Sequence, residues 1–352
     1  MTRAIPWWHP ERFRRRRPYL AARAAIQAGL RNYFATQGFS EVETPALQVS
    51  PGLEPELQAF ATRIAAPGGE ERPLYLQTSP EFAMKKLLAA GAGAIFQFAR
   101  AYRNGERSDT HHPEFTLLEW YRPEASYERL IGDCEALLAA ALAAVPGGRC
   151  FRWRGREAVP GPLEVVTVAE AFARATGIDL RSTLSSSGEP DGAALAQAAQ
   201  RIGIRTAAAD RWDDVFFRIF LERIEPGLGS PRPTVLRDYP IHMAALSRPK
   251  PSDPGLAERF ELYVCGLELA NAFGELTDAQ EQARRFAQDQ ATRRARHGAA
   301  YPVDEDFLAA LRFGLPESAG IALGFDRLVM LATGAGHIED VLWAPVADFP
   351  PR

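Results

Sequence analysis

The sequence predicts an α+β protein in which an antiparallel β-sheet is flanked by helices. Residues 94–103 and 114–122 have the alternating pattern of two strands joined by a polar loop. Residues 258–273 and 319–324 also have strand character, and segments with helical periodicity surround them. Because strands joined by short connections pair antiparallel while separate helices cover them, this order favours the α+β class.

The helices are expected where apolar residues recur at helical spacing. One begins at Tyr19 and ends at Gln37, where Gly38 suits a C′ position. Another is expected over 81–90, since Ser79 is a good N-cap and Pro80 suits the first turn. Further helices are expected at 126–145, 167–176, 191–202, 212–224, 277–298, 304–313 and 325–334. Further extended segments are expected at 39–47, 57–64, 74–77, 151–159 and 234–238.

The chain has 352 residues, of which 46% are hydrophobic, and this size fits one large domain or two ordinary ones. Residues 1–17, with arginines at 14–17, are expected to be an irregular lead-in to a domain that covers 18–345. Residues 150–235 have the least informative pattern, and we expect an inserted, variable helical region there.

Charge and cysteine content provide no indication of several classes of protein. A net charge of −3 provides no basic field of the kind that proteins bound mainly to nucleic acid usually carry. Cys134, Cys150 and Cys265 form no CxxC pair, so neither a disulfide framework nor a zinc site is indicated. The longest apolar run, 137–145, is far short of the roughly 20 residues of a membrane span. With no apolar signal segment either, the sequence predicts a cytoplasmic protein.

Charged and aromatic side chains share one face of the first predicted hairpin. Alternation places Phe115, Glu119 and Tyr121 on one face of the second strand. On the first strand, small residues precede Arg103, which leaves space above the sheet. Since a guanidinium suits a phosphate and a buried acid needs a cation, this face is typical of a nucleotide platform or of an internal salt bridge.

Three acids interrupt an otherwise apolar stretch, RFELYVCGLELANAFGEL. They are Glu261, Glu268 and Glu275, and Asn271 and Phe273 alternate onto one face with the last of them. Paired carboxylates bind Mg²⁺ through oxygen, commonly together with nucleotide phosphates. A structural ion pair with a neighbouring arginine is the alternative for any one of the three acids.

Near the C-terminus, the glycine-containing strand AGIALG leads directly into a helix. Its glycines permit close approach of a ligand to the backbone. Arg327 lies in the first turn of that helix, where backbone N–H groups also favour anions. An ion pair between Arg327 and Asp326 is the plainer explanation of the same pattern.

Together these segments resemble the three signature motifs of class II aminoacyl-tRNA synthetases. GFSEVETPAL is similar to motif 1, FARAYRNGERSDTHHPEFTLLEWY to motif 2 and AGIALGFDRL to motif 3. TSPEFAMKKLL and LELANAFGELTDAQEQARRF also resemble the lysyl branch. The resemblance covers residues 18–335 and implies the class II catalytic fold.

Lysyl-tRNA synthetases carry an N-terminal anticodon-binding domain, for which this chain has no room before motif 1. The chain is therefore more similar to their truncated paralogues, the elongation factor P–(R)-β-lysine ligase family. Ala322 stands where lysyl-tRNA synthetases have glycine and the ligase family has alanine. The resemblance implies a homodimeric, AMP-forming ligase that uses ATP and Mg²⁺. It implies (R)-β-lysine or lysine as substrate and elongation factor P as acceptor, with tRNA not expected as a partner.

The resemblance also implies roles for individual residues. Arg103 and Arg327 would be catalytic and bind the α- and γ-phosphates, Phe115 would stack on adenine, and Glu261 and Glu268 would hold Mg²⁺. The other implied ATP-binding residues are Asn104, Glu106, His111, Leu269 and Gly324. The implied amino-acid site comprises Ser79, Pro80, Glu81, Glu119, Tyr121, Asn271, Phe273, Glu275 and Ala322.

Motif 2 departs from the lysyl branch at two places. The chain has Gly105-Glu106 where that branch has Glu-Gly, so the acid implied at the adenine amino group is displaced by one residue. His112 stands where an asparagine is usual after His111.

Three other functions are compatible with the motifs. An enzyme that charges tRNA through the acceptor stem alone would use the arginines at 14–17. An amide-forming enzyme would transfer the activated amino acid to a small molecule. A non-catalytic module that binds an amino acid could lose the phosphate-binding arginines or the acidic pairs without penalty, and here all of them are present.

Overall fold

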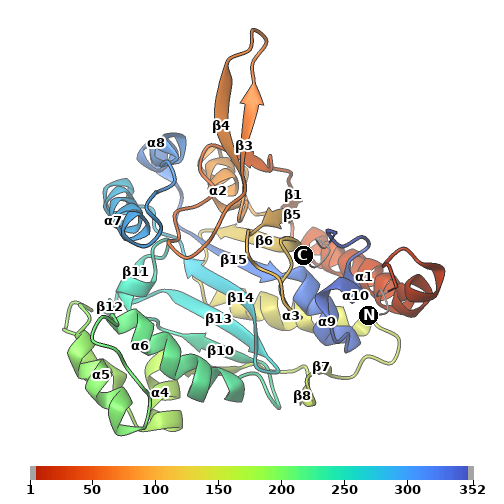
Figure 1. The fold of residues 1–352 in the computed structure, drawn as a ribbon. Helices are drawn as coiled ribbons and strands as arrows, with labels where there is room; N and C mark the ends of the chain where they lie inside the picture. The colour runs from red at the N-terminus through yellow and green to blue at the C-terminus, as the bar shows by residue number, and fades with distance from the viewer. Residues whose placement is uncertain (1–4, 348–352) are drawn as a thin grey trace.

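The computed structural model describes residues 5–347, and a mixed eight-stranded sheet lies at its centre (Figure 1). The strand order is β1-β5-β6-β15-β14-β13-β10-β9, with parallel pairing only in the outer pairs β1–β5 and β9–β10. Its strands are β1 (Ser40–Glu41), β5 (Ile95–Tyr102), β6 (Glu114–Pro123), β9 (Glu164–Thr167), β10 (Thr234–Arg237), β13 (Arg259–Val264), β14 (Leu267–Gly274) and β15 (Ser318–Gly324). The antiparallel centre with flanking helices confirms the predicted class.

The helices lie around this sheet and in an appended lobe. They are α1 (Pro10–Thr36), α2 (Glu81–Ala89), α3 (Arg129–Ala143), α4 (Val168–Thr176), α5 (Gly192–Arg201), α6 (Trp212–Ile219), α7 (Ala279–His297), α8 (Glu305–Gly314), α9 (Phe325–Thr333) and α10 (Ile338–Val341). Along the part of the chain from 5 to 347, no helix combines the length and apolar character needed to cross a bilayer.

The two faces of β6 differ because its side chains alternate. Leu118 and Trp120 are fully buried in a core formed with α1, α3 and α9. Glu119 and Tyr121 point to the opposite face, which no helix of that core covers (Figure 1). The sheet therefore has one face devoted to packing and one that is available for a site.

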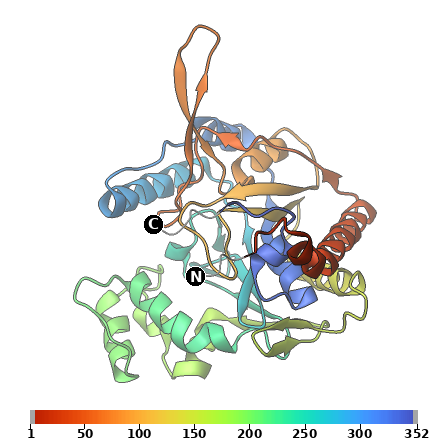
Figure 2. The same cartoon turned by 45° about the vertical axis from the view of Figure 1, so that its right-hand side comes forward.

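Smaller two- and three-stranded sheets accompany the central sheet. Their strands are β2 (Leu47–Gln48), β3 (Ala61–Ala65), β4 (Glu71–Leu76), β7 (Phe151–Trp153), β8 (Arg156–Ala158), β11 (Pro249–Lys250) and β12 (Asp253–Ala257). The β3–β4 hairpin projects away from the body of the molecule in both views (Figures 1 and 2). The expected hairpin at 151–159 is confirmed as β7–β8.

The first helix begins earlier than expected. It starts at Pro10, inside the stretch for which we expected an irregular lead-in, and residues 1–4 of that stretch lie outside the described residues. His9 caps it by accepting a hydrogen bond from the N–H of Glu11. Arg16 is buried and donates to the carbonyl of Leu342, a contact that apolar periodicity could not reveal.

Two further segments differ from expectation. Residues 258–273 form the β13–β14 hairpin, whose turn places Cys265 and Gly266 at φ 56° and 77°. Because the turn has cysteine instead of the usual asparagine or aspartate, its sequence signal is weak. The region 150–235 is not wholly helical, since β9 and β10 extend the central sheet while α4, α5 and α6 pack around Phe172 and Phe216.

One buried ion pair ties three segments of the core together. Asp326, at the start of α9, pairs with Arg23 of α1 and accepts the backbone N–H of Thr116 in β6 at 2.7 Å. Arg23 also donates to the Thr116 hydroxyl at 3.0 Å. The contact fixes the turn that carries Arg327 against the strand that carries Phe115. Asp326 is thus a structural acid, and Arg327 does not depend on it for a partner.

We predict that Arg23→Met lowers the free energy of unfolding by about 3–5 kcal/mol, because it leaves the Asp326 carboxylate buried without a cation. Arg63→Met is the control, since Arg63 pairs with Glu71 on the exposed hairpin and such pairs contribute about 0–1 kcal/mol. Urea denaturation of both variants is the measurement. Equal loss of stability in the two variants would contradict the role of Arg23.

Candidate active site

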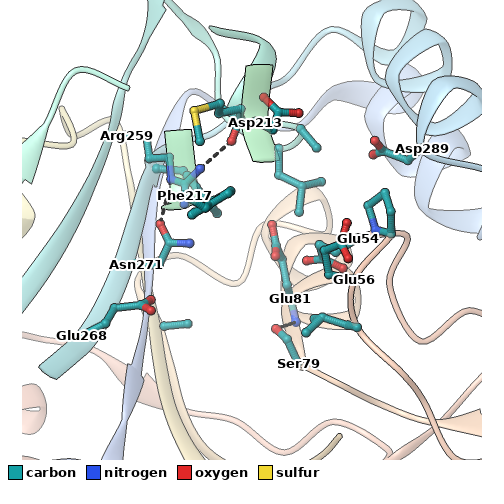
Figure 3. A pocket seen from close by; sticks show the side chains of 18 of the residues that line it. Glu54, Glu56, Ser79, Glu81, Asp213, Phe217, Arg259, Glu268, Asn271 and Asp289 are labelled. Carbon is teal, nitrogen blue, oxygen red and sulfur yellow. Dashed lines mark hydrogen bonds between the residues drawn. The ribbon is translucent and has the colours of Figure 1, made fainter. Parts of the chain in front are cut away.

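A cavity of about 1270 Å³ lies over the available face of the sheet. Its walls come from β6, β14 and β15, from α6 and α7, and from the loop at 54–57 (Figure 3). The predicted site residues that line it are Ser79, Glu81, Arg103, Glu106, His111, Phe115, Glu119, Tyr121, Glu268, Leu269, Asn271, Phe273, Glu275, Ala322, Gly324 and Arg327. The fold thus brings most of the predicted set to one place.

Three predicted residues are placed differently. Pro80 is the N-cap of α2, and its neighbours Ser79 and Glu81 reach the cavity. Asn104 is exposed, and its backbone N–H donates to the carbonyl of Gln58 at 2.7 Å. Glu261 is buried outside the cavity lining, on β13 opposite Asn271 of β14.

Two guanidinium groups lie at one end of the cavity. Arg103 lies over the Phe115 ring, with 5.2 Å between its Cζ and the ring centroid. Arg327 donates to the carbonyl of Glu268 at 2.8 Å and to His111 Nε2 at 2.7 Å. Burial, and next the charge of Arg327, lower the pKa of His111, so the imidazole is neutral and accepts this bond. Two cations beside an aromatic ring suit a nucleotide and its phosphates.

Glu268 and Glu261 lie next to each other on the β13–β14 hairpin. Burial, together with the nearby Glu261 charge, raises the pKa of Glu268 to about 7. Glu261 accepts hydrogen bonds from the Tyr239 and Tyr263 hydroxyls at 2.6 and 2.5 Å, and it pairs with Arg259 at 2.5 Å. Glu268 therefore fits a hard cation directly, whereas Glu261 would have to exchange one of these partners for it.

No preformed metal cage accompanies this acidic pair. Between residues 5 and 347, no three His, Cys, Asp or Glu side chains converge in a way that could hold a metal ion. The donor set fits an ion such as Mg²⁺ that takes most of its oxygens from phosphates and water.

Carboxylates gather at the other end of the cavity. Glu119 is 1% exposed and accepts hydrogen bonds from Ser79 at 2.6 Å and from Tyr121 at 3.2 Å. Burial, and next the charge of Glu81, raise the pKa of Glu119 to about 8. Burial also raises the pKa of Glu275 to about 7, although Lys85 opposes the effect. Buried acids of this kind bind ammonium groups well, because each then gains the cation it lacks.

The floor of the cavity between these two ends is formed by β14 and β15. Asn271 accepts a hydrogen bond from Arg259 at 3.3 Å and lies opposite Ala322 in the β14–β15 register (Figure 3). Gly320 lies opposite Tyr121, and a Cβ at Gly320 would approach the tyrosine ring to 2.3 Å. Only glycine lets the phenol reach Glu119 in this position.

Several cavity residues were missed by sequence reasoning. Arg259 was considered only as an ion-pair partner, yet it lines the cavity. Glu54 and Asp289 face the same space from a loop and from α7 (Figure 3). Lys85 does not line the cavity, but its buried contact with Glu81 was also missed. A spacing of four residues signals a helical ion pair and says nothing about burial.

The fold agrees with a comparison to known families. A family model described as "tRNA synthetases class II (D, K and N)" matches residues 9–348. The match covers most of the chain, including the strands and helices that form the cavity. The fold is therefore that of a class II tRNA synthetase domain.

Several relatives are similar along most of their length. One from Pectobacterium atrosepticum is 41% identical over 326 residues, which is 92% of this chain and 93% of the relative. Others from Erwinia tasmaniensis and Salmonella paratyphi B are 42% and 41% identical, over 327 and 329 residues. All three are named elongation factor P–(R)-β-lysine ligase. The chain belongs to this ligase family.

The raised pKa values predict that affinity for a diamino acid increases with pH. Below its pKa of about 8, Glu119 is protonated in the empty pocket and cannot pair with an ammonium group. Affinity for lysine, measured by calorimetry without ATP, should therefore rise several-fold from pH 6 to pH 8. Glu119→Gln, which removes this titration, should bind more weakly and show a flatter pH profile. A wild-type affinity that is constant or falls over this range would contradict the assignment.

Proposed function

We propose that the protein activates (R)-β-lysine with ATP as an aminoacyl-adenylate and transfers it to a lysine side chain of elongation factor P. The observation that carries the proposal is the polarity of the cavity. Arg103 and Arg327 line it beside Phe115 and His111, close to the start of β6. Glu81, Glu119 and Glu275 gather further along that strand, around Glu119 and Tyr121. A diamino acid spans such a cavity with its carboxylate towards the arginines and its ammonium groups towards the acids. The names of the relatives support the same reaction.

The activation step needs no nucleophile from the protein. The substrate carboxylate attacks the α-phosphorus of ATP, the bond to the bridging oxygen breaks, and pyrophosphate leaves. Arg103 would stabilise charge that develops on the α-phosphate, and Arg327 would hold the γ-phosphate. Mg²⁺, when bound beside Glu268, would neutralise phosphate charge. The cavity residues thus act by positioning and by electrostatic stabilisation.

The transfer step consumes the adenylate. The neutral amine of an acceptor lysine attacks the activated carbonyl carbon and an amide bond forms. The bond from that carbon to the anhydride oxygen of the adenylate breaks, and AMP leaves with its electron pair. The proton lost by the amine passes to a base or to solvent. A net charge of −3 favours a protein acceptor over tRNA.

The proposal also covers the location and the assembly of the protein. A cytoplasmic location is supported by the three cysteines, which are buried free thiols. A homodimer is supported by the resemblance of GFSEVETPAL to the dimer-interface motif. In the substrate pocket, the Ala322 methyl group would distinguish close substrates by about 1–3 kcal/mol.

The proposal predicts faster ATP–pyrophosphate exchange with (R)-β-lysine than with α-lysine, and none without an amino acid. Purified protein and radiolabelled pyrophosphate suffice for the measurement. Faster exchange with α-lysine would revive a tRNA or small-molecule acceptor. No exchange with either amino acid would contradict the proposed activation.

Arg103→Ala should reduce exchange by about 10²-fold or more, because it removes a cation from the charge that develops in the transition state. Arg107→Ala is a control in the same loop, since Arg107 contacts Glu339 and Val346 outside the cavity. Glu268→Gln should raise the Mg²⁺ concentration needed for half-maximal exchange. Normal exchange by Arg103→Ala would remove Arg103 from the mechanism.

A further inference from the structure

Behind the acidic end of the cavity lies a buried cation, Lys85. It belongs to α2 and its side chain is 0% exposed. Its Nζ lies 2.6 Å from Glu81 Oε1 and 2.5 Å from Glu275 Oε2. Both carboxylates line the cavity, whereas Lys85 does not. Lys85 therefore contacts the amine-binding acids from the protein side and leaves their other surface to a ligand.

Stability alone gives little reason for a lysine at this position. A buried ion pair recovers the desolvation cost of its charges only in part, and well-packed apolar residues often stabilise a core equally well. Burial would lower the pKa of Lys85, but Glu275 and Glu81 outweigh burial and hold the pKa above its usual value. The ammonium is thus kept charged inside the protein by the two acids that face the cavity.

The charge of the pocket explains what this cation does. Three ionised carboxylates, Glu81, Glu119 and Glu275, would carry three negative charges, and Lys85 cancels one of them. The two that remain equal the number of ammonium groups on a diamino acid. Glu54 faces the same space, but burial, and next the charge of Glu81, raise its pKa and favour its neutral form. Without Lys85, two acids within reach of one ammonium would repel each other and take up a proton instead.

We propose that Lys85 is a positioning residue that determines specificity for a diamino acid. Its ammonium fixes the Glu81 and Glu275 carboxylates in place and sets the pocket to two negative charges. The inference rests on the proposed function, because it assigns the ammonium groups of that substrate to these acids. It extends the proposal to a residue that touches neither the amino acid nor ATP.

Other polar and charged groups also face Glu275, and they remain when Lys85 is substituted. They are Glu81 of α2, Glu119 and Tyr121 of β6, and Arg248. Arg248 is paired with Glu258 at 2.5 Å and with Glu317 at 3.6 Å, so it cannot replace Lys85.

The test uses pyrophosphate exchange by the full-length protein. Lys85→Met should raise the KM for the amino acid by about tenfold or more, with little change in the KM for ATP. Lys86→Met is the matched control. Lys86 follows Lys85 in the same helix but pairs with Asp304 at 2.8 Å and Asp306 at 3.0 Å, neither of which lines the cavity. Its loss should reduce thermal stability and leave the amino-acid KM unchanged.

The double variant Lys85→Met/Glu275→Gln separates a charge effect from a packing effect. It removes one cation and one acid together, so the pocket keeps two negative charges. It should bind the amino acid more tightly than either single variant, a coupling that a merely structural lysine would not produce. Should Lys85→Met be unstable, the comparison of the double variant with Glu275→Gln alone decides the question.

Two results would overturn the inference: a wild-type amino-acid KM in Lys85→Met, or a double variant no better than the single variants. Failure of the proposed function is a different result, in which the wild-type protein exchanges pyrophosphate with neither amino acid. In that case the affinity for α-lysine, measured by calorimetric titration of the same variants, is compared in place of the KM. Weaker binding by the single variants with recovery in the double variant would support the role of Lys85, and equal or absent binding throughout would overturn it.

Discussion

Every charge held out of water in this protein needs a partner, and this constraint shapes both the core and the cavity. Asp326 has Arg23, Glu261 has Arg259 and two phenols, and Glu275 has Lys85. Among residues 5–347, the donors to Glu119 are the hydroxyl groups of Ser79 and Tyr121, and no cation pairs with it. Its pKa is raised by burial and next by the charge of Glu81. A ligand with ammonium groups completes what the fold leaves incomplete.

The alternation of side chains along one strand, β6, separates the buried core from the charged cavity. On β6, Leu118 and Trp120 bury against helices, while the intervening Glu119 and Tyr121 face the cavity. The neighbouring strand β15 contributes Gly320, which leaves room for the Tyr121 ring. Sheet periodicity thus gives one face of the sheet to core packing and the other to the cavity. The Arg23–Asp326 pair fixes the end of the cavity that carries Arg103 and Arg327 relative to this strand.

Local patterns were sufficient for most of the elements, and most of the predicted site residues line the cavity. Periodicity of two places Phe115, Glu119 and Tyr121 on one face, and the structure agrees. Long-range contacts were not accessible in this way. The buried contact of Arg16 with Leu342 extends α1 through a stretch that has no apolar pattern. Lys85 was missed for a similar reason, because its burial depends on Glu275, which is far away in the chain. Glu261 stays a predicted Mg²⁺ ligand, and its contacts with Tyr239, Tyr263 and Arg259 could not be inferred from spacing.

The most direct test of this account is a crystal structure with a non-hydrolysable analogue of (R)-β-lysyl-adenylate. The account predicts that the phosphate contacts Arg103 and that both ammonium groups lie within hydrogen-bonding distance of the acids Glu81, Glu119 and Glu275. It also predicts that Lys85 keeps its contacts behind them. An analogue bound in the reverse orientation, or with its ammonium groups directed towards solvent, would contradict the account.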